Sequence, residues 1–368
     1  MILLLVKIPP PLTGATLMNQ YIVNSKVLKN KFDIHTISIS YKKDINDKHK
    51  YSFKKIFSIL KFHFKLFRKL IIFKPNIVYF QISPLGIAFI RDCTYVFWLK
   101  LFRIHIVYHL HGKGIKKASE NSIVMRFLYR WAFNGSSVIC LSNLLVDDIS
   151  TVYSGVPYIV NNGIPKITYY KKKKYENSST VNILFLSNLI YSKGIFDFLD
   201  SLLLLDIQLR AKIRVQIVGE DAEISSTMLS EEISKRGLSN FITYLGPKHG
   251  DEKYKCLYDS DILVYPTLND AFPLVLLEAM QFGIPVIASV EGAIPEIVDN
   301  GVTGFLAEKN RPDLIAEKMK ILIENNQLRK EMGMSARKKF LEKYTLEIFE
   351  QNMVNTFNEI IYTNKWKQ

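Results

Sequence analysis

The sequence predicts an α/β protein built from two domains, each with a parallel sheet. Short apolar segments alternate with amphipathic helical segments almost from end to end of the 368 residues. This alternation is typical of parallel strands joined by crossover helices. The length suits two domains of ordinary size, each able to bury its own core. No internal repeat stands out beyond these two α/β halves.

The expected strands fall into two series, separated by a polar, charged run. The run covers 171–179 and reads Lys-Lys-Lys-Lys-Tyr-Glu-Asn-Ser-Ser, which is typical of a solvated linker. We therefore predict a first domain over 1–170, a linker over 171–180, a second domain over 181–345 and a C-terminal helical segment over 346–368. The first series of strands is expected at 2–6, 32–38, 77–81, 104–109, 137–141 and 158–160. The second series is expected at 182–186, 214–218, 242–245, 262–265, 285–288 and 304–306.

Cysteine usage and hydropathy predict a cytoplasmic protein without a membrane span. The three cysteines stand far apart in the sequence and lack metal-type spacing, which indicates reduced thiols. The opening segment, Met1 to Lys7, is too short for the apolar region of a signal peptide and reads as a buried strand. The apolar stretch 85–102 is interrupted by Arg91, Asp92 and Lys100, which disfavours a membrane span.

Charge is concentrated in the first half of the chain. Residues 1–175 hold 28 Lys and Arg against 7 Asp and Glu, whereas the remainder holds 21 against 27, so the two parts carry net charges of +21 and −6. A basic half of this size attracts polyanions or anionic membranes. Within it, the segment 53–73 alternates aromatic or aliphatic residues with Lys and Arg at helical intervals. That composition is typical of an interfacial helix, and equally of an amphipathic helix packed on a core; both descriptions can hold together.

Two carboxylates eight positions apart form the most informative local pattern. Asp270 and Glu278 flank the segment Ala-Phe-Pro-Leu-Val-Leu-Leu, in which apolar residues recur at helical intervals. Glu278 therefore lies beside an apolar stripe, where an unpaired charge is costly. Pro273 suits a first helical turn, and the free amides of that turn can bind an anion. A surface helix with a chance acid pair is the alternative interpretation.

The same pattern resembles the E-x7-E element of the family 4 retaining glycosyltransferases, which have the two-domain GT-B fold. Other stretches match that family in the same order, nearly throughout 181–345 and thinly over 1–165. They are Leu186-Ser-Asn188-Leu-Ile-Tyr-Ser-Lys193-Gly194, Ile217-Val-Gly219-Glu, Gly292-Ala-Ile-Pro-Glu296-Ile-Val and Asn300-Gly301-Val-Thr-Gly304-Phe-Leu, with Pro9 to Gly14, His109-Leu-His111-Gly112 and Asn161-Asn162-Gly163 in the first half. The resemblance implies two Rossmann-like domains whose sheets face across a cleft, and a C-terminal helix that crosses back to the first domain.

The resemblance also implies roles for individual residues. It assigns Glu278 to the ribose hydroxyls of a nucleotide sugar and Asp270 to the hydroxyls of the transferred sugar, while Lys193 is placed to meet the diphosphate. His111 is expected near the acceptor, although alternation leaves open whether His109 or His111 points into the cleft. The predicted catalytic residues are therefore His111, Lys193, Asp270 and Glu278. The predicted donor-binding set is Gly14, Asn188, Lys193, Gly219, Leu245, Phe272, Pro273, Leu274, Val275 and Glu278.

Three positions depart from the family pattern. Asp270 stands where Glu is usual, Asn188 where Arg is common and Ala271 where Gly is frequent. Asn188 removes one phosphate-binding cation, which leaves Lys193 as the principal cation for the diphosphate. The pair Asp259 and Asp261 reads as a helix end rather than a metal motif, so we predict a metal-independent reaction without a cofactor.

The function expected from these features is retaining transfer of a hexosyl or N-acetylhexosaminyl unit to a lipid-linked saccharide in bacterial surface polysaccharide synthesis (capsule, O-antigen or exopolysaccharide). A UDP-sugar is favoured as donor over a GDP-sugar, and the enzyme is expected to sit peripherally on the inner face of the cell membrane, on an anionic surface. Alternatives are a nucleotide-sugar-binding protein without transferase activity and a nucleotide-sugar epimerase. A nucleic-acid binder is disfavoured, because the basic half contains no recognised module.

Overall fold

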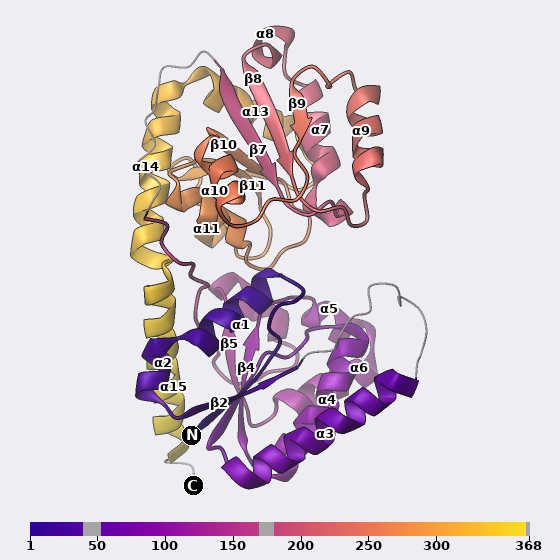
Figure 1. Ribbon diagram of the computed structural model, residues 1–368, viewed down its shortest axis with the longest axis vertical. Coiled ribbons are helices and arrows are strands. Elements are labelled where there is room, and N and C mark those ends of the chain that lie inside the picture. The colour runs from indigo at the N-terminus through magenta and orange to yellow at the C-terminus, as the bar shows by residue number, and fades with distance from the viewer. Residues whose placement is uncertain (40–52, 169–179, 366–368) are drawn as a thin grey trace. The chain divides into compact units, whose positions relative to one another are not determined.

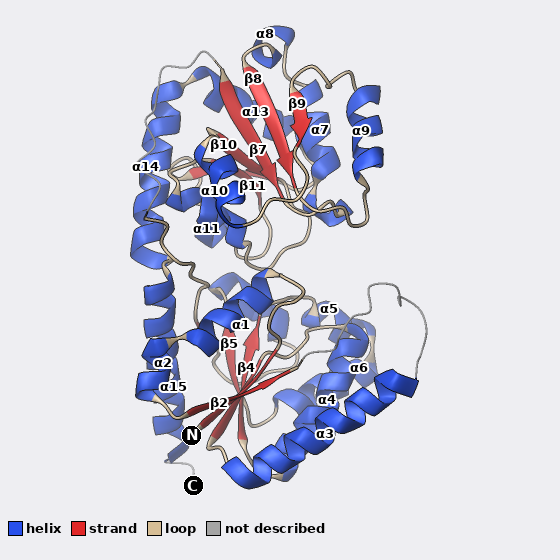
Figure 2. Ribbon diagram, viewed as in Figure 1, coloured by secondary structure: helices blue, strands red, loops and turns tan. Residues whose placement is uncertain are grey.

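The computed structural model describes residues 1–39, 53–168 and 180–365, which divide into two compact units (Figure 1). Unit 1 comprises Met1–Asn162 and Glu347–Gln368, and unit 2 comprises Gly163–Leu346. The predicted linker at 171–180 lies almost entirely outside the described residues. Each unit is a parallel sheet covered by helices, as Figure 2 shows. The predicted α/β fold with two Rossmann-like domains is therefore confirmed.

The sheet of unit 1 has the strand order β2-β1-β3-β4-β5-β6, and every neighbouring pair is parallel. Its central strands are buried on both faces, which explains their unbroken apolar sequences. The strands are β1 Ile2–Val6, β2 Ile34–Ser38, β3 Ile77–Phe80, β4 His105–Leu110, β5 Ser137–Cys140 and β6 Tyr158–Ile159. The helices are α1 Gly14–Asn24, α2 Lys26–Lys31, α3 Phe53–Phe73, α4 Gly86–Leu101, α5 Ile115–Asn121, α6 Ile123–Phe133 and the 3-10 helix η1 Asn143–Ile149.

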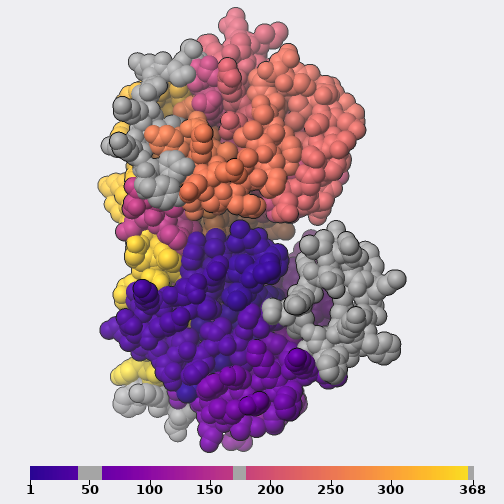
Figure 3. Space-filling model, in the orientation of Figure 1, coloured from indigo at the N-terminus to yellow at the C-terminus, as the bar shows by residue number. Residues whose placement is uncertain are grey.

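The C-terminal helix α15, Leu346–Lys365, packs on unit 1, as the fold prediction required. Its ring contacts show how: Phe357 lies edge-on to Phe32 and Tyr79, with centroids 5.8 and 5.9 Å away. Phe357 is fully buried, so this contact contributes to the core of unit 1. On the face seen in Figure 3, the surface of unit 1 is formed mostly by the early part of the chain, in indigo and violet, with yellow α15 beside it.

The sheet of unit 2 has the order β12-β11-β10-β7-β8-β9, again with every pair parallel. Its strands are β7 Val181–Leu186, β8 Ile213–Val218, β9 Ile242–Tyr244, β10 Ile262–Tyr265, β11 Val286–Ser289 and β12 Gly304–Ala307. The helices are α7 Ile195–Leu203, α8 Ile207–Arg210, α9 Ser226–Lys235, α10 Gly250–Tyr258, α11 Leu274–Gln281, α12 Ile294–Ile297, α13 Pro312–Glu324, α14 Asn326–Lys343 and the 3-10 helix η2 Tyr191–Lys193. All twelve predicted strands are present.

In each sheet, chain order reverses at one point. In unit 1 the chain moves outward from β1 to β2 and then returns to place β3 on the other side of β1. In unit 2 the same reversal separates β7 from β10. The loops that leave the carboxyl ends of such strands diverge and leave a crevice, which is where ligands bind in open α/β sheets. The two reversal points therefore mark where binding residues are expected.

Candidate active site

The predicted residues of unit 2 come from loops at the carboxyl edge of its sheet. Lys193 follows β7 and Asp270 follows β10, so these two residues stand on either side of the reversal point. Gly219 and Leu245 follow β8 and β9 at the same edge. Residues up to 77 positions apart are thus gathered at the edge where open α/β sheets bind ligands.

Lys193 and Asp270 form a direct ion pair. The Lys193 Nζ lies 2.5 Å from Asp270 Oδ2, and the two side chains are only 20% and 18% exposed. The hydroxyl of Tyr265, the last residue of β10, donates to the same carboxylate oxygen at 2.7 Å. Burial and the neighbouring Asp270 both raise the pKa of Tyr265, so this hydroxyl stays a donor at neutral pH. The pair therefore presents a fixed ammonium at the sheet edge.

Two glycines allow the backbone of this site to close tightly. Gly194 has φ +76°, in the left-handed region, and a Cβ there would lie 1.9 Å from the Pro266 carbonyl oxygen. A Cβ on Gly219 would lie 1.8 Å from the Ser187 carbonyl oxygen. Any side chain at either position would push apart the loops that follow β7, β8 and β10. The glycines thus fix the position of Lys193 relative to Asp270.

The loop after β7 also orients Asn188 and contacts the next strand. The Asn188 Oδ1 accepts a hydrogen bond of 3.4 Å from the Glu220 amide, so its side chain lies against the turn after β8. The Leu245 amide donates to the Ile217 carbonyl at 2.9 Å and leaves a half-buried leucine beside Gly246. Asn188, Gly219 and Leu245 therefore border one continuous edge.

The stretch from Phe272 to Val275 leads into α11. The helix begins at Leu274, one residue later than the sequence indicated, so Pro273 is the N-cap and lies just outside the first turn. Proline has no hydroxyl or carboxylate to offer, and no side chain caps this end of the helix. The amides of Leu274 and Val275 at the positive end of the helix dipole are therefore available to an anion.

Glu278 is buried on α11 and paired with a residue that the sequence did not indicate. Its side chain is 10% exposed, and Lys253 Nζ of α10 lies 2.6 Å from its Oε1. Pairing offsets the cost of burying the carboxylate. Within the described parts of the chain the other oxygen, Oε2, has no such partner, so it can accept hydrogen bonds from a diol.

A second buried carboxylate supports the loop of Asp270. Glu291 is 5% exposed, and its Oε1 accepts a hydrogen bond of 3.4 Å from the Asp270 amide. Lys309 completes the arrangement at 2.6 Å from Glu291 Oε2. Sequence reasoning missed Lys253, Glu291, Lys309 and Tyr265, because each acts through a contact between separate elements; only the position of Tyr265 at the end of a predicted strand offered a signal.

In unit 1, His109 and His111 have different surroundings. His109 is fully buried in β4, where its Nδ1 lies 2.7 Å from the Tyr79 hydroxyl. His111 follows β4 and lines a cavity of about 510 Å³ with Thr13 and Ala15, the neighbours of Gly14 at the start of α1. Burial lowers the pKa of His111 to about 3, so the ring is neutral. The structure thus places His111, rather than His109, on the cavity.

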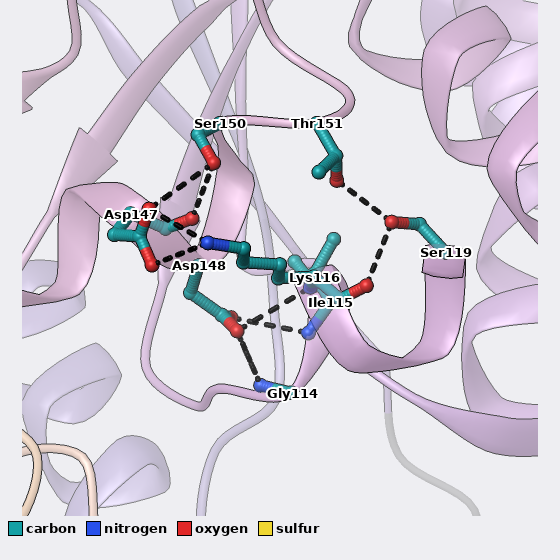
Figure 4. Close-up of polar contacts among 8 residues, drawn as sticks. All are labelled: Gly114, Ile115, Lys116, Ser119, Asp147, Asp148, Ser150 and Thr151. Atoms are coloured by element: carbon teal, nitrogen blue, oxygen red, sulfur yellow. Dashed lines mark hydrogen bonds and ion pairs between the residues drawn. The ribbon is translucent and has the colours of Figure 1, made fainter. Parts of the chain in front are cut away.

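The loop that carries His111 is anchored at its far end by Asp148 of η1 (Figure 4). Both carboxylate oxygens of Asp148 accept from the Gly114 amide at 2.9 Å, and one also accepts from the Ile115 amide at 3.1 Å. Next to it, Lys116 Nζ lies 2.8 Å from Asp147 Oδ2. Asp148 therefore occupies the amino end of α5, and this helix start serves to hold the loop rather than to bind a ligand.

Known proteins share both the sequence pattern and this fold. Residues 166–339 match the family model "Glycosyl transferases group 1". An uncharacterized glycosyltransferase of Methanocaldococcus jannaschii is 27% identical over 74% of this chain and 74% of its own length. N-acetyl-alpha-D-glucosaminyl L-malate synthase of Bacillus anthracis is 27% identical over 71% of this chain and 68% of its own length. The capsular polysaccharide biosynthesis glycosyltransferase CapM of Staphylococcus aureus is 25% identical over 53% of this chain and 51% of its own length.

Solved structures show the same architecture at low identity. Sucrose-phosphate synthase of Thermosynechococcus elongatus superposes with a TM-score of 0.75 at 15% identity, over 99% of this chain and 100% of that chain. HepE of Anabaena, in complex with UDP, superposes with a TM-score of 0.74 at 18% identity, over 97% and 99%. Sequence similarity and fold together identify a glycosyltransferase, an enzyme that takes a sugar from a nucleotide sugar donor. Within that class, the chain is similar to the group 1 glycosyltransferases over residues 166–339, and its fold is the GT-B fold.

Proposed function

We propose that this enzyme is a retaining hexosyl- or N-acetylhexosaminyl-type transferase of bacterial surface polysaccharide synthesis. It takes the sugar from a UDP-sugar, with a GDP-sugar as the second candidate, and passes it to a lipid-linked saccharide at the inner face of the cell membrane. The observation that carries the proposal is the fixed ammonium of Lys193 beside Asp270 at the reversal point of unit 2.

The chemistry needs a cation where Lys193 stands. Transfer breaks the bond between the anomeric carbon and the diphosphate and forms one to an acceptor hydroxyl, so negative charge grows on the departing nucleoside diphosphate. A preorganised cation stabilises that charge and supplies a large part of the catalysis. Lys193 acts as the cation, and the uncapped amides of Leu274 and Val275 provide further donors.

The carboxylates hold hydroxyl groups in this proposal. Glu278 is anchored through Oε1 by Lys253, which leaves Oε2 for the ribose diol. Asp270 is held by Lys193 and Tyr265 through Oδ2, which leaves Oδ1 for hydroxyls of the transferred sugar. Because Asp270 is one methylene shorter than glutamate, its contacts with Lys193 and Tyr265 set how far it reaches. His111 serves the acceptor side as a neutral hydrogen-bonding group.

The functions of the similar proteins support the substrate choice. HepE was crystallised with UDP and with UDP-glucose, which favours a UDP-sugar donor here. CapM is a capsular polysaccharide biosynthesis enzyme, and WaaB, a lipopolysaccharide outer core galactosyltransferase, superposes with a TM-score of 0.71 at 16% identity. Both act in surface polysaccharide synthesis, which favours the same pathway type for this chain.

The membrane assignment rests on three helices of unit 1. α4 packs against both α3 and α6. Together the three helices contain ten Lys and Arg and a single acidic residue, Asp92, which is fully buried. Within the described ranges, none of the helices is long and apolar enough to cross a membrane.

The same helices expose large apolar side chains at helical intervals. Phe64 of α3 is 70% exposed, Ile87 of α4 is 75% exposed and Phe127 of α6 is 69% exposed. The other exposed members are Leu60, Ile71, Ile72, Ile90, Phe97, Leu101, Ile123 and Val124. Apolar stripes flanked by basic side chains suit the interface of an anionic bilayer.

Calorimetric titration with UDP and GDP tests the donor site. The wild-type protein should bind one of the two nucleotides, and Lys193→Ala should weaken that binding by about tenfold or more, because a charge-assisted contact to phosphate is lost. Lys212→Ala provides a matched control, since Lys212 is an exposed lysine of unit 2 just before the amino end of β8. Equal nucleotide affinity in wild type and Lys193→Ala would refute the assigned role of Lys193.

Liposome sedimentation tests the membrane assignment. Neutralising Lys61, Lys65, Arg68 and Lys69 should weaken binding to anionic vesicles by more than about a hundredfold, since each charge contributes about 1 kcal/mol near an anionic surface. Phe64→Ser should weaken binding as well, whereas Ile207→Ser, at a position of unit 2 that is 80% exposed, should not. Unchanged binding in the charge variant would exclude these helices as the docking face.

A further inference from the structure

The cavity of about 510 Å³ in unit 1 lies at the reversal point of that sheet. Its walls include Lys7 after β1, Ser83 after β3 and His111 after β4. This is the position at which open α/β sheets bind ligands, and its volume is within the range of small-molecule sites. His111 and Gly14, whose neighbours Thr13 and Ala15 line the cavity, have predicted roles, whereas Lys7 has none.

Lys7 is a half-buried cation without a carboxylate partner in the described parts of the chain. Its Nζ donates to the Ser83 hydroxyl at 2.6 Å, across the gap between the ends of β1 and β3. Among the described residues it forms no ion pair within 4 Å. Burial lowers the pKa of Lys7, and the carboxylate of Asp92 partly opposes this effect. A cation held in this way is costly unless an anion completes its surroundings.

The nearby carboxylate is already engaged. Asp92 is fully buried; its Oδ2 accepts from the Ser83 amide at 2.8 Å, and its Oδ1 accepts from Arg91 Nε and a terminal Arg91 nitrogen at 2.9 and 2.6 Å. Asp92 is thus paired with Arg91, and Lys7 has no carboxylate within ion-pair distance among the described residues. Ser83 therefore links Lys7 to the Arg91–Asp92 pair, but its hydroxyl does not neutralise the charge of Lys7.

Other groups on the cavity wall also suit an anion. α1 begins there, with Thr13 as its N-cap, so the positive end of an 11-residue helix adds to the potential. The Nε2 atom of His111 is buried and has no hydrogen-bond partner among the described residues. A neutral imidazole nitrogen can donate to an anionic oxygen, and a bound group would satisfy it.

We propose that this cavity is a subsite for a phosphate or carboxylate group carried by a substrate, and that Lys7 is the residue that binds it. The proposal rests on the transferase function proposed above and deepens it. If the anionic group belongs to the acceptor, Lys7 selects acceptors that carry a charged oxygen group near the reacting hydroxyl. The other source of the same chemistry is the diphosphate of the donor.

Titration with inorganic pyrophosphate, alone and after saturation with UDP, tests the proposal. Lys7→Met should weaken pyrophosphate binding to the UDP-saturated protein by about tenfold or more, because a hydrogen bond to a charged group is lost. Lys7→Arg keeps the charge and should retain most of the binding. Lys29→Met provides the matched control, since Lys29 is exposed on α2. Lys7→Gln is measured in parallel, so that the result does not depend on the folding of one variant.

The outcomes separate the two sources of the anion. Weaker pyrophosphate binding with unchanged UDP affinity assigns the subsite to the acceptor. An equal loss of UDP affinity in Lys7→Met assigns the subsite to the donor diphosphate. Unchanged binding of both ligands in Lys7→Met and Lys7→Gln overturns the proposal. Failure of the proposed function gives a different result, because the wild-type protein would then bind neither nucleotide even where pyrophosphate binding depends on Lys7.

Discussion

Units 1 and 2 share one architecture but differ in whether the charged side chains at the sheet edge have partners of opposite charge. In unit 2 each charged group of the site has a partner: Lys193 with Asp270, Lys253 with Glu278 and Lys309 with Glu291. In unit 1 the corresponding edge holds neutral histidines, the Arg91–Asp92 pair and Lys7, whose side chain bonds only the Ser83 hydroxyl among the described residues. The parallel sheet therefore fixes where a ligand binds, while the side chains decide which charge it meets.

The largest expected effect concerns the cation of unit 2. Lys193→Ala should reduce turnover by about 10²- to 10³-fold, the range seen when one preorganised transition-state donor is removed. Initial rates with the donor identified by titration and a suitable saccharide acceptor measure this, with Lys212→Ala as control. A rate within about threefold of wild type would mean that Lys193 is only a structural partner of Asp270. Lys193 would then not be the cation that unit 2 presents to the ligand.

The next effect concerns the paired charges themselves. Lys253→Met should lower the free energy of unfolding by about 1–3 kcal/mol, because it leaves the buried Glu278 carboxylate without its partner. The double variant Lys253→Met with Glu278→Leu should recover much of that stability yet bind donor poorly. Urea unfolding of both single variants and the double variant measures the coupling. Additive losses would show that the pair does not stabilise unit 2.

A further expected effect is a pH dependence to which the two buried histidines of unit 1 contribute. Burial lowers the pKa of His111 to about 3 and that of His109 well below its ordinary value. The unfolded chain then binds more protons than the folded chain below about pH 6.5. Stability should therefore be unaffected by these rings above that pH and should fall by up to about 1.4 kcal/mol per pH unit for each ring as the pH decreases.

Urea unfolding at pH 7.5 and pH 5.0 measures this pH dependence. His111→Asn should reduce the loss of stability at pH 5.0, whereas His249→Asn, at an exposed position of unit 2, should not. An identical loss in His111→Asn and wild type would show that this ring does not contribute to the acid sensitivity.

The sequence left open whether α3 packs on a core or lies at a membrane interface, and the structure shows both buried and exposed apolar residues on this helix. Leu66 and Leu70 are buried against unit 1, whereas Phe64 on the same helix is 70% exposed. Periodicity identified the helix over 53–73 correctly. It could not tell which apolar face packs inward, because both faces of this helix carry apolar residues.

The sequence by itself determined the strands, the parallel sheets and the positions of Lys193, Asp270 and Glu278 in the chain. These follow from local patterns, since apolar runs, glycine turns and helical spacing act over a few neighbouring residues. The start of α11 shows the limit of such patterns, because Pro273 lies outside the first turn.

Only the tertiary structure decided the partners. Lys253 meets Glu278 from 25 residues away, and Lys7 meets Ser83 from 76 residues away. Neither contact follows from local spacing, because each depends on which strands neighbour one another and on how the helices lie across the sheet. His109 and His111 differ for the same reason. Strand alternation would point both side chains to one face of the sheet. Because β4 ends at Leu110, His111 lies outside the strand and lines the cavity.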